Sequence, residues 1–479
     1  MPPISRAPTA PGRLSQAHRA GFAGLVGTTV EWYDFFIFTT SAGLVFPKVF
    51  FPAASSGTGV LASFATLWVG FVGRPLGAVI FGHIGDRHGR RRSLVTSLLL
   101  MGSATTAIGL LPGHHLAGTA APVLLCALRL VQGIAVGGEW GGAVLLAGEH
   151  APKDRRPFFT AYAQQGTPLA SVLASAAFLP FSALGDADFL TWGWRIPFLG
   201  SAVLMAIGLA IRLRVTESPE FASMVRHADV AARPVRDTLR RHSGALLLCV
   251  GVCAIPVAGT YLAGTFVLSW ATEHIGFPRE TVLTVVLCAA VARFLVQPAA
   301  ALAARRAGTG RVFAAGLGLY LLAIPANIVC LGTGSVGWIA VGVGTLETAS
   351  AIAYAVVAAL LVDAFPARVR YTGISLAQQL AGVAFGGTAP ALAQGLAAAG
   401  HGCLWPVAGY QALLVAVSAC CLPPLVLRAR RTPADHTRTS PTGTGAPGEH
   451  GRRPRLAAAR LNVTDSQGAP PSPELDSGA

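Results

Sequence analysis

Apolar runs of about 20 residues recur along the chain and are separated by short polar stretches. A helix of this length crosses a hydrocarbon core of about 30 Å, and helices are expected because a backbone in lipid must satisfy its own hydrogen bonds. We predict twelve spans, at about 22–46, 61–81, 94–112, 120–148, 158–184, 194–211, 244–271, 281–304, 312–332, 336–362, 372–399 and 406–427. The pattern therefore predicts an all-α integral membrane protein.

Composition supports this interpretation. Of 479 residues, 53% are hydrophobic and only 12% are charged, which is too few charges for an ordinary soluble protein. The eight cysteines lie in or near the apolar runs, and none has a metal-binding spacing with histidine. We therefore expect small core residues at these positions and no metal site.

The charge distribution predicts the orientation of the chain. The net charge is +15, but 30 of the 36 Lys and Arg residues fall in the two termini and the even-numbered loops. The positive-inside rule then places both termini in the cytoplasm of a multi-pass protein of the cell (plasma or inner) membrane. The basic excess is expected to face anionic lipid rather than nucleic acid.

The spans divide into two groups of six. We predict a cytoplasmic N-terminal segment at 1–20, six-helix bundles at 21–211 and 244–427, a cytoplasmic linker at 212–243 and a disordered cytoplasmic tail at 428–479. The tail is rich in Pro, Gly, Ser, Thr and Arg and has too little apolar content to fold alone. The linker contains Thr216-Glu217-Ser218-Pro219-Glu220-Phe221, which is typical of a helix start.

Polar residues recur at equal spacing in the two groups. Arg74 and Asp86 correspond to Arg293 and Arg305, Pro152 and Gln164-Gln165 to Pro366 and Gln378-Gln379, and Glu149 to Asp363. The first two spacings are twelve residues in both halves, and each acid stands three residues before its proline. These correspondences predict duplicated halves with a site at their interface. Because Arg305 stands where the first half has Asp86, the charge network at that loop is expected only once.

Residues 82–92 form the most informative loop. They carry five charges in eleven residues and lie between two apolar runs, so they must form a turn at a membrane face. Its candidate conformational-gating residues are Gly82, Asp86, Arg87, Gly89 and Arg90. The pattern of a glycine, Asp-Arg four residues later and then Gly-Arg resembles the loop signature of the major facilitator superfamily.

Further motifs resemble the metabolite:proton symporter family of that superfamily. They are Glu31-Trp32-Tyr33-Asp34-Phe35, Gly73-Arg74-Pro75-Leu76-Gly77, Arg129-Leu130-Val131-Gln132-Gly133, Val136-Gly137-Gly138-Glu139-Trp140-Gly141-Gly142 and Trp192-Gly193-Trp194-Arg195-Ile196-Pro197-Phe198. The resemblance covers about residues 20–427 and is greatest to the shikimate-permease-like branch of a family that includes α-ketoglutarate, citrate and proline/betaine permeases. It implies the twelve-helix major facilitator fold and makes Arg74, Arg129 and Arg195 candidates for anion binding or helix pairing.

Ionisable residues inside the spans are candidates for proton coupling, because charge within a bilayer is costly. Glu31 and Asp34 lie on one face of the first span, and either is our first choice for the proton carrier. Glu139 is the next candidate, although it lies among glycines and is also interpretable as a structural partner. A nearby arginine favours the charged carboxylate, so a substrate that competes for the arginine links proton and substrate occupancy.

The candidate substrate-binding residues combine cationic and hydrogen-bonding side chains. They are Tyr33, Arg74, Arg129, Arg195, Gln164 and Gln378. Each has a structural alternative: the arginines would join helices or extend to the interface, and the glutamines would bond to neighbouring helices.

The sequence predicts a secondary transporter and not an enzyme, because no nucleotide loop, zinc motif or nucleophile constellation is present. The function predicted is proton-coupled symport, by alternating access, of a small polar metabolite such as an organic acid or a betaine- or amino-acid-like compound. Export by proton antiport and a non-transporting membrane sensor are the alternatives. The expected partners are the substrate, protons and the bilayer, with no cofactor besides the proton gradient, and the expected oligomeric state is a monomer.

Overall fold

The fold is known from a computed structural model, which describes residues 10–52, 56–152, 155–182, 186–227, 229–271, 275–277 and 279–431. These residues form helices and no strand. Ten helices or helix groups among them are long and apolar enough to cross a membrane. Residues 1–9 of the predicted N-terminal segment and 432–479 of the predicted tail lie outside the described residues.

The first half contains six membrane passes and three short connecting helices. Its elements are α1 (Ala10–Leu44), α2 (Phe46–Val49), α3 (Ser56–His88), α4 (Arg90–Leu110), α5 (His114–Ala117), α6 (Ala120–His150), α7 (Arg156–Gln164), α8 (Gly166–Ser182), α9 (Asp186–Asp188), η2 (Phe189–Gly193) and α10 (Arg195–Leu213). Two further helices, α11 (Pro219–Arg226) and α12 (Pro234–Arg241), form the linker.

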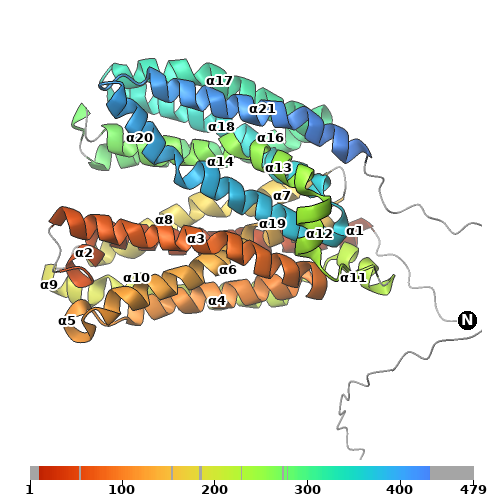
Figure 1. The fold of residues 1–479 in the computed structure, drawn as a ribbon, viewed down its shortest axis with the longest axis horizontal. Helices are drawn as coiled ribbons and strands as arrows, with labels where there is room; N and C mark the ends of the chain where they lie inside the picture. Colours follow the sequence, from red (N-terminus) through yellow and green to blue (C-terminus); the bar gives the residue numbers. More distant parts are fainter. Residues whose placement is uncertain are drawn as a thin grey trace, which may run out of the picture. The chain divides into compact units, whose positions relative to one another are not determined.

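The second half repeats the pattern of six passes. Its elements are α13 (Ser243–Val252), α14 (Ala254–Tyr261), η3 (Leu262–Phe266), α15 (Val267–Trp270), α16 (Arg279–Ala307), α17 (Thr309–Gly332), α18 (Val336–Ala364), η5 (Ala367–Val369), α19 (Arg370–Ala381), η6 (Gly382–Gly387), α20 (Ala389–Ala399) and α21 (Trp405–Arg431). In Figure 1 the first half runs from red to yellow and the second from green to blue, with α3 and α19 adjacent at their contact.

The two passes not counted by length and hydropathy are α1 and the pair α7–α8. The first carries Glu31 and Asp34 and begins at Ala10, well before the predicted residue 22. The second is divided at Gln165, which separates two helices of 9 and 17 residues. Both pack within the bundle, against α6 and each other, so the twelve-helix fold predicted from the apolar runs is confirmed.

The repeat is visible in the backbone at two equivalent turns. Helix α3 ends at His88, and Gly89 alone, with φ 114°, connects it to α4. Helix α16 ends at Ala307, and Gly308, with φ 91°, connects it to α17. Only glycine adopts positive φ without strain, so the Gly-containing loop and its altered copy keep the same turn.

The linker is ordered where the sequence predicts a helix start. Ser218 is the N-cap of α11, and its Oγ accepts a hydrogen bond from the N–H of Phe221 at 3.2 Å, with Pro219 in the first turn. Helix α10 continues to Leu213, so Arg212, which the predicted linker includes, lies in a membrane helix and is buried.

Candidate functional site: a central cavity and a charged network

A small cavity lies within the first half, among α1, α3, α4 and α6. It is lined by Glu31, Trp32, Asp34, Phe35, Gly70, Arg74, Met101, Arg129, Gln132, Gly133 and Val136. Its volume is about 20 Å³, enough for one water molecule and too small for a metabolite. Four of the predicted site residues, Glu31, Asp34, Arg74 and Arg129, therefore share one small cavity.

Glycines bring the two arginines of this cavity together. Helices α3 and α6 are in backbone contact, since a Cβ at Gly77 would collide with the carbonyl of Ile134 and one at Gly133 with the carbonyl of Gly70. Such small-residue faces allow close helix packing in membranes. Arg74 on α3 and Arg129 on α6 consequently lie on adjoining helices beside the same cavity.

The two guanidinium groups contact aromatic rings rather than acids. Arg74 lies 4.3 Å from the ring centroid of Phe71, and Arg129 lies 4.2 Å from that of Phe38, both within cation–π range. Among the described residues neither arginine forms an ion pair, and the buried Nε of Arg129 has no hydrogen-bond partner. Both therefore retain donors for an anion.

The two acids of α1 have different surroundings. Asp34 accepts hydrogen bonds from Thr105 Oγ1 at 2.5 Å and Ser201 Oγ at 2.6 Å. Glu31 is also buried, but its Oε2 has no hydrogen-bond partner among the described residues. Asp34 is thus held by neutral hydroxyl groups, whereas Glu31 has an oxygen free to accept from a bound molecule.

A chain of hydrogen bonds connects Asp34 to Arg129. Gln132 accepts from Arg129 Nη1 at 3.1 Å and donates through Nε2 to Thr105 Oγ1 at 2.6 Å. Thr105 also lies 3.0 Å from the carbonyl oxygen of Met101, a second acceptor for its single hydroxyl proton. Its hydroxyl can therefore donate to a charged Asp34, or donate to Met101 while accepting from a protonated Asp34.

Glu139 lies outside this cavity and is ion-paired. Its carboxylate pairs with Arg212 of α10 and accepts from Ser97 Oγ at 3.1 Å, and all three side chains are buried. Arg212 also donates to the carbonyl oxygen of Leu94 at 2.6 Å. A Cβ at Gly27 of α1 would collide with Arg212, so α1 packs directly on the pair. The geometry is that of a structural connection among α1, α4, α6 and α10.

Two other candidates lie away from the cavity lining. Tyr33 is buried against α10 and donates to the carbonyl oxygen of Pro197 at 2.9 Å. Arg195 donates to the carbonyl oxygens of Gly109 and Leu111 at 2.9 and 2.6 Å, where α4 ends. A cation at a helix C-terminus is stabilising, so Arg195 completes the last turn of α4.

The glutamines lie at contacts with the second half. Gln164 Nε2 donates to the carbonyl oxygen of Tyr354 at 3.3 Å, and Gln165 donates to Gln297 at 2.9 Å. Gln378 instead lies within the second half, where its Oε1 is 3.7 Å from the thiol of Cys253.

Arg293, the repeat equivalent of Arg74, has a different environment. It forms an ion pair with Glu347 at 3.1 Å and donates to Thr260 at 2.7 Å. The repeat therefore preserves an arginine in both halves, but only the first half leaves it without an acidic partner among the described residues.

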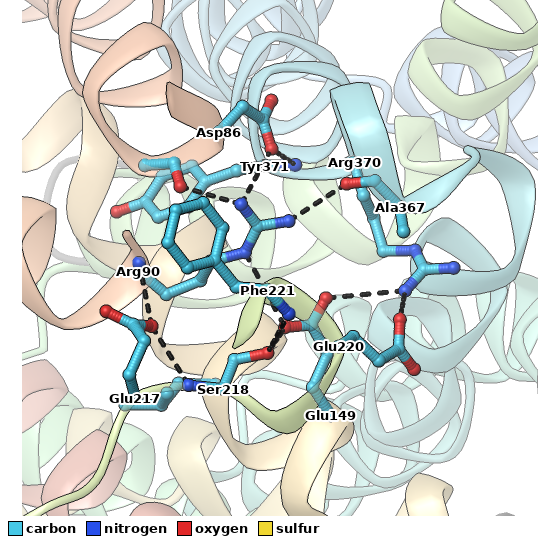
Figure 2. Close-up of polar contacts among 12 residues, drawn as sticks. Asp86, Arg90, Glu149, Glu217, Ser218, Glu220, Phe221, Ala367, Arg370 and Tyr371 are labelled. Carbon is cyan, nitrogen blue, oxygen red and sulfur yellow. Dashed lines mark hydrogen bonds and ion pairs between the residues drawn. The ribbon is translucent and has the colours of Figure 1, made fainter. Parts of the chain in front are cut away.

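A second cluster of charges joins the halves at the end of the bundle that carries the α3–α4 turn. We call it the charged network, and its members are Asp86, Arg90, Glu149, Arg156, Glu220, Asp363 and Arg370. Figure 2 shows its centre, with side chains from α3, α4, α6, α11 and α19 converging. Asp86, Arg90 and Glu149 are at most 6% exposed, so the bundle is closed at this end.

Asp86 binds the N-terminus of a helix in the other half. Its two oxygens accept from the N–H groups of Tyr371 and Thr372 at 3.1 and 2.9 Å, in the first turn of α19. The helix dipole favours an anion at this position, at up to about 2 kcal/mol in buried geometries. Arg90 lies 3.3 Å from the same carboxylate, which is therefore paired on both sides.

Arg90 is fully buried and uses its guanidinium to connect four elements. It donates to the carbonyl oxygens of Gly85 at 2.7 Å and Ala367 at 2.9 Å. Its Nε lies 3.5 Å from Glu149, and the ring of Phe221 stacks 5.1 Å from its Cζ. Arg90 thereby connects α3, α6, α11 and the turn that precedes α19 (Figure 2).

The repeat produces two reciprocal ion pairs between the halves. Arg156 of the first half lies 3.2 Å from Asp363 of the second, and Arg370 of the second lies 3.3 Å from Glu149 of the first. Glu220 of the linker pairs with both arginines. The linker helix α11 therefore bridges the two symmetric contacts.

The two arginines lower the pKa of Glu220. Burial alone would raise the pKa of this carboxyl group, but the attraction of Arg370 and then Arg156 outweighs it, and the pKa lies below the ordinary value. Glu220 is therefore ionised at neutral pH and contributes a fixed negative charge to the network.

The five predicted gating residues have different contacts at the end of the bundle that carries the charged network. Gly82 packs against Thr372, Gly89 forms the turn, and Asp86 and Arg90 belong to the charged network. Arg87 is exposed and forms no ion pair or hydrogen bond among the described residues.

Comparison with known proteins identifies the family to which this chain belongs. A family model for "Sugar (and other) transporter" matches residues 21–248. The chain is 39% identical over 388 residues to the shikimate transporter of Escherichia coli (strain K12), covering 80% of this chain and 88% of that protein. The chain belongs to the metabolite transporters of the major facilitator superfamily.

Other similarities agree with that assignment. The proline/betaine transporter of Escherichia coli (strain K12) is 30% identical to this transporter, over 82% of this chain and 80% of its own. The major facilitator superfamily proton:xylose symporter XylE, bound to 6-bromo-6-deoxy-D-glucose, has the same fold, with a TM-score of 0.65 and 17% identity over 88% of this chain and 96% of its own. The protein is therefore a multi-pass membrane transporter and not an enzyme.

Sequence reasoning about this transporter missed the partners of its charged residues. Thr105 and Ser201, which hold Asp34, are ordinary polar residues within apolar runs, and nothing in the sequence distinguishes them. Arg156 and Arg370 carried a usable signal, because each stands four residues after the repeated proline. Arg212 was not predicted to lie in a membrane helix because the apolar run ends at residue 211, whereas α10 continues to Leu213.

Proposed function

We propose that this transporter imports a small organic acid together with protons across the cell membrane. The two six-helix halves, at about 21–211 and 244–427, would move against each other and so expose the cavity of the first half alternately to the two sides of the membrane. The observation that carries the proposal is the grouping of Glu31, Asp34, Arg74 and Arg129 around one cavity.

Both termini and the charged network are placed on the cytoplasmic side in this proposal. The support is the positive-inside rule, since the turns and linker at this end contain most of the Lys and Arg residues. The structure then corresponds to the arrangement closed toward the cytoplasm. The small cavity must widen before it admits a substrate.

Asp34 is the proposed proton carrier. Its partners are hydroxyl groups, which can donate to a carboxylate or accept from a carboxylic acid, so both protonation states can be satisfied. Glu139 differs because, besides the Ser97 hydroxyl, its main partner is the guanidinium of Arg212, which donates hydrogen bonds and cannot accept one. Glu31 remains the second candidate, because it is buried and lines the same cavity.

Arg74 and Arg129 are the proposed binding groups for a substrate carboxylate. Neither has an acidic partner among the described residues, and guanidinium groups bind carboxylates through paired hydrogen bonds. The unpartnered oxygen of Glu31 would accept a hydrogen bond from a substrate hydroxyl or ammonium group. Shikimate, a hydroxylated carboxylate named for the relative above, satisfies both requirements.

The test is uptake of labelled shikimate into proteoliposomes, with and without an imposed pH gradient. Asp34→Asn should abolish accumulation driven by protons and preserve exchange between preloaded and external substrate. Asp188→Asn is the matched control, because Asp188 is exposed on a connecting helix. Normal accumulation by Asp34→Asn would exclude Asp34 as the carrier, and Glu31→Gln would then be measured in the same way.

Substrate class is tested separately, with the wild type alone. Shikimate, proline and glycine betaine are offered at equal concentration under the same pH gradient. Uptake of shikimate in preference to betaine supports recognition of a substrate hydroxyl group, since all three compounds carry a carboxylate. Uptake of betaine alone would contradict the proposed role of Glu31, because betaine has a carboxylate for Arg74 but no hydroxyl or N–H group to donate to Glu31.

A further inference from the structure

A second cavity lies at the charged end of the bundle, outside the site already described. It is a cleft of about 420 Å³ between α3 and α12, a size typical of small-ligand sites. Its lining comprises three arginines, one histidine and two apolar side chains: His83, Arg233, Val235, Arg236, Leu239 and Arg240. No part of the transport mechanism above uses these residues.

The arginines of the cleft have no acidic partner among the described residues. Arg233, Arg236 and Arg240 are exposed, and none of them forms an ion pair among the described residues. Arg236 and Arg240 are four residues apart and lie on one face of α12. The acid of this helix, Asp237, is instead 3.9 Å from Arg241.

One edge of the cleft continues into the apolar surface of α3. Val72, Leu76 and Ile80 are 64%, 53% and 45% exposed and follow one another at four-residue intervals. This spacing places them on one face of the helix, and His83 follows one turn later. Leu239 of the cleft is itself 50% exposed. A ligand in the cleft would therefore meet arginines at one end and a membrane-facing apolar stripe at the other.

We propose that this cleft binds an anionic phospholipid. Its phosphate group would lie against Arg236 and Arg240, with Arg233 and His83 beside it, and an acyl chain would follow Val72, Leu76 and Ile80. Arginine binds phosphate through paired hydrogen bonds, and each basic residue near an anionic membrane surface attracts it. The continuity of charge and apolar stripe favours a lipid over a soluble anion.

The position of α12 gives the lipid a consequence for gating. This helix contacts α3 of the first half and α13, η5 and α19 of the second. The lipid would add contacts between α12 and α3, which meet across the closed end of the bundle. Its binding therefore favours the arrangement in which the charged network is formed.

The primary test measures lipid binding directly, so it does not depend on the transported substrate. The intact protein is purified in detergent and titrated with phosphatidylglycerol or phosphatidylcholine, and bound lipid is counted by native mass spectrometry. The variant Arg236→Gln/Arg240→Gln should bind phosphatidylglycerol about tenfold more weakly than the wild type. The control Arg214→Gln/Arg226→Gln removes two exposed charges outside the cleft, neither of which forms an ion pair among the described residues, and should change binding less than about twofold.

Three outcomes would overturn the proposal. Equal weakening in both double variants would mean general attraction to basic protein, and equal affinity for the two lipids would mean no headgroup recognition. Displacement of phosphatidylglycerol by inorganic phosphate at equal concentration would assign the cleft to a soluble anion. His83→Gln alone, which leaves α12 unchanged, should weaken binding by a smaller factor and guards against misfolding of the double variant.

Discussion

At the residue scale, the buried acids of the first half divide by the type of partner they have. Asp34 is bound by two hydroxyl groups, whereas Glu139 is bound by the guanidinium of Arg212 as well as the hydroxyl of Ser97, although both acids lie in apolar helices. Hydroxyl groups accommodate a change of protonation, whereas an arginine stabilises one charge state. The partner, rather than burial, therefore distinguishes the proposed proton carrier from a structural acid.

Removing one member of the Glu139–Arg212 pair should destabilise the protein more than replacing both, because a single replacement leaves the other charge buried without a partner. Arg212→Met leaves a buried carboxylate without its cation and should destabilise the protein by about 3–5 kcal/mol. The double variant Glu139→Gln/Arg212→Met should recover part of this loss. Thermal unfolding midpoints in detergent measure both, with Arg214→Met, at an exposed position at the end of α10, as control. A double variant less stable than Arg212→Met would refute the pairing argument.

Glu220 should affect the transport rate by a factor that does not depend on pH near neutrality. Its lowered pKa keeps it ionised, so its contribution to the closed end is present above its ordinary pKa of 4.5 and is lost only as pH falls below that. Glu220→Gln should therefore reduce uptake by up to about tenfold, equally between about pH 5 and 7. The measurement is initial uptake by both proteins at several pH values. A ratio that changes within this window would assign Glu220 a titrating role.

At the element scale, glycines determine how closely helices approach at two seams. Gly77 and Gly133 bring α3 and α6 into backbone contact, and Gly85 receives the ring of Tyr371 from α19. The first seam lies within one half and positions the arginines, whereas the second lies between the halves. A methyl group should therefore have different consequences at each.

Gly85→Ala should oppose closure without unfolding the first half. A Cβ there would collide with Tyr371, and such overpacking costs about 1–3 kcal/mol. The open arrangement should become more populated, and a cysteine at the buried position Ser375 should react faster with a thiol reagent. Gly318→Ala is the control, because nothing lies within 4 Å of a Cβ at that glycine. Equal labelling rates in the two variants would exclude the contact from gating.

Much of the fold was predictable from the pattern of apolar residues, and the features that this pattern did not predict have local causes. The pattern predicted all twelve passes but not the break of α7–α8 at Gln165 or the π-helical segments η3 and η6, because hydropathy carries no information on helix winding. Charged positions in spans led to Glu31, Asp34, Arg74 and Arg129. Their hydroxyl and amide partners were unpredictable because contacts such as Asp34–Ser201 join residues 167 positions apart.

At the scale of the whole molecule, the charged network lies where α3 ends and α19 begins, whereas Cys403 lies between α20 and α21. Figure 1 shows the α20–α21 turn at the opposite end of the bundle. If the network faces the cytoplasm, a membrane-impermeant thiol reagent should label exposed Cys403 in intact cells. Arg87→Cys in a Cys403→Ser background should be labelled only after the membrane is permeabilised. Labelling of Arg87→Cys in intact cells would reverse the proposed orientation.

The binding of Asp86 to the start of α19 has no equivalent in the other half. By the repeat, its counterpart would be an acid at position 305 that accepts from the N–H groups of residues 157 and 158. The chain has Arg305 and Pro157 there, so the acid and one of the two donors are both missing. Separation at this end therefore breaks two helix-terminal hydrogen bonds along α3–α19 that have no counterpart beside α7. The Arg156–Asp363 and Arg370–Glu149 pairs, which the two sides share, must also break. We expect the halves to rotate about an axis nearer α7, with the larger displacement at Asp86.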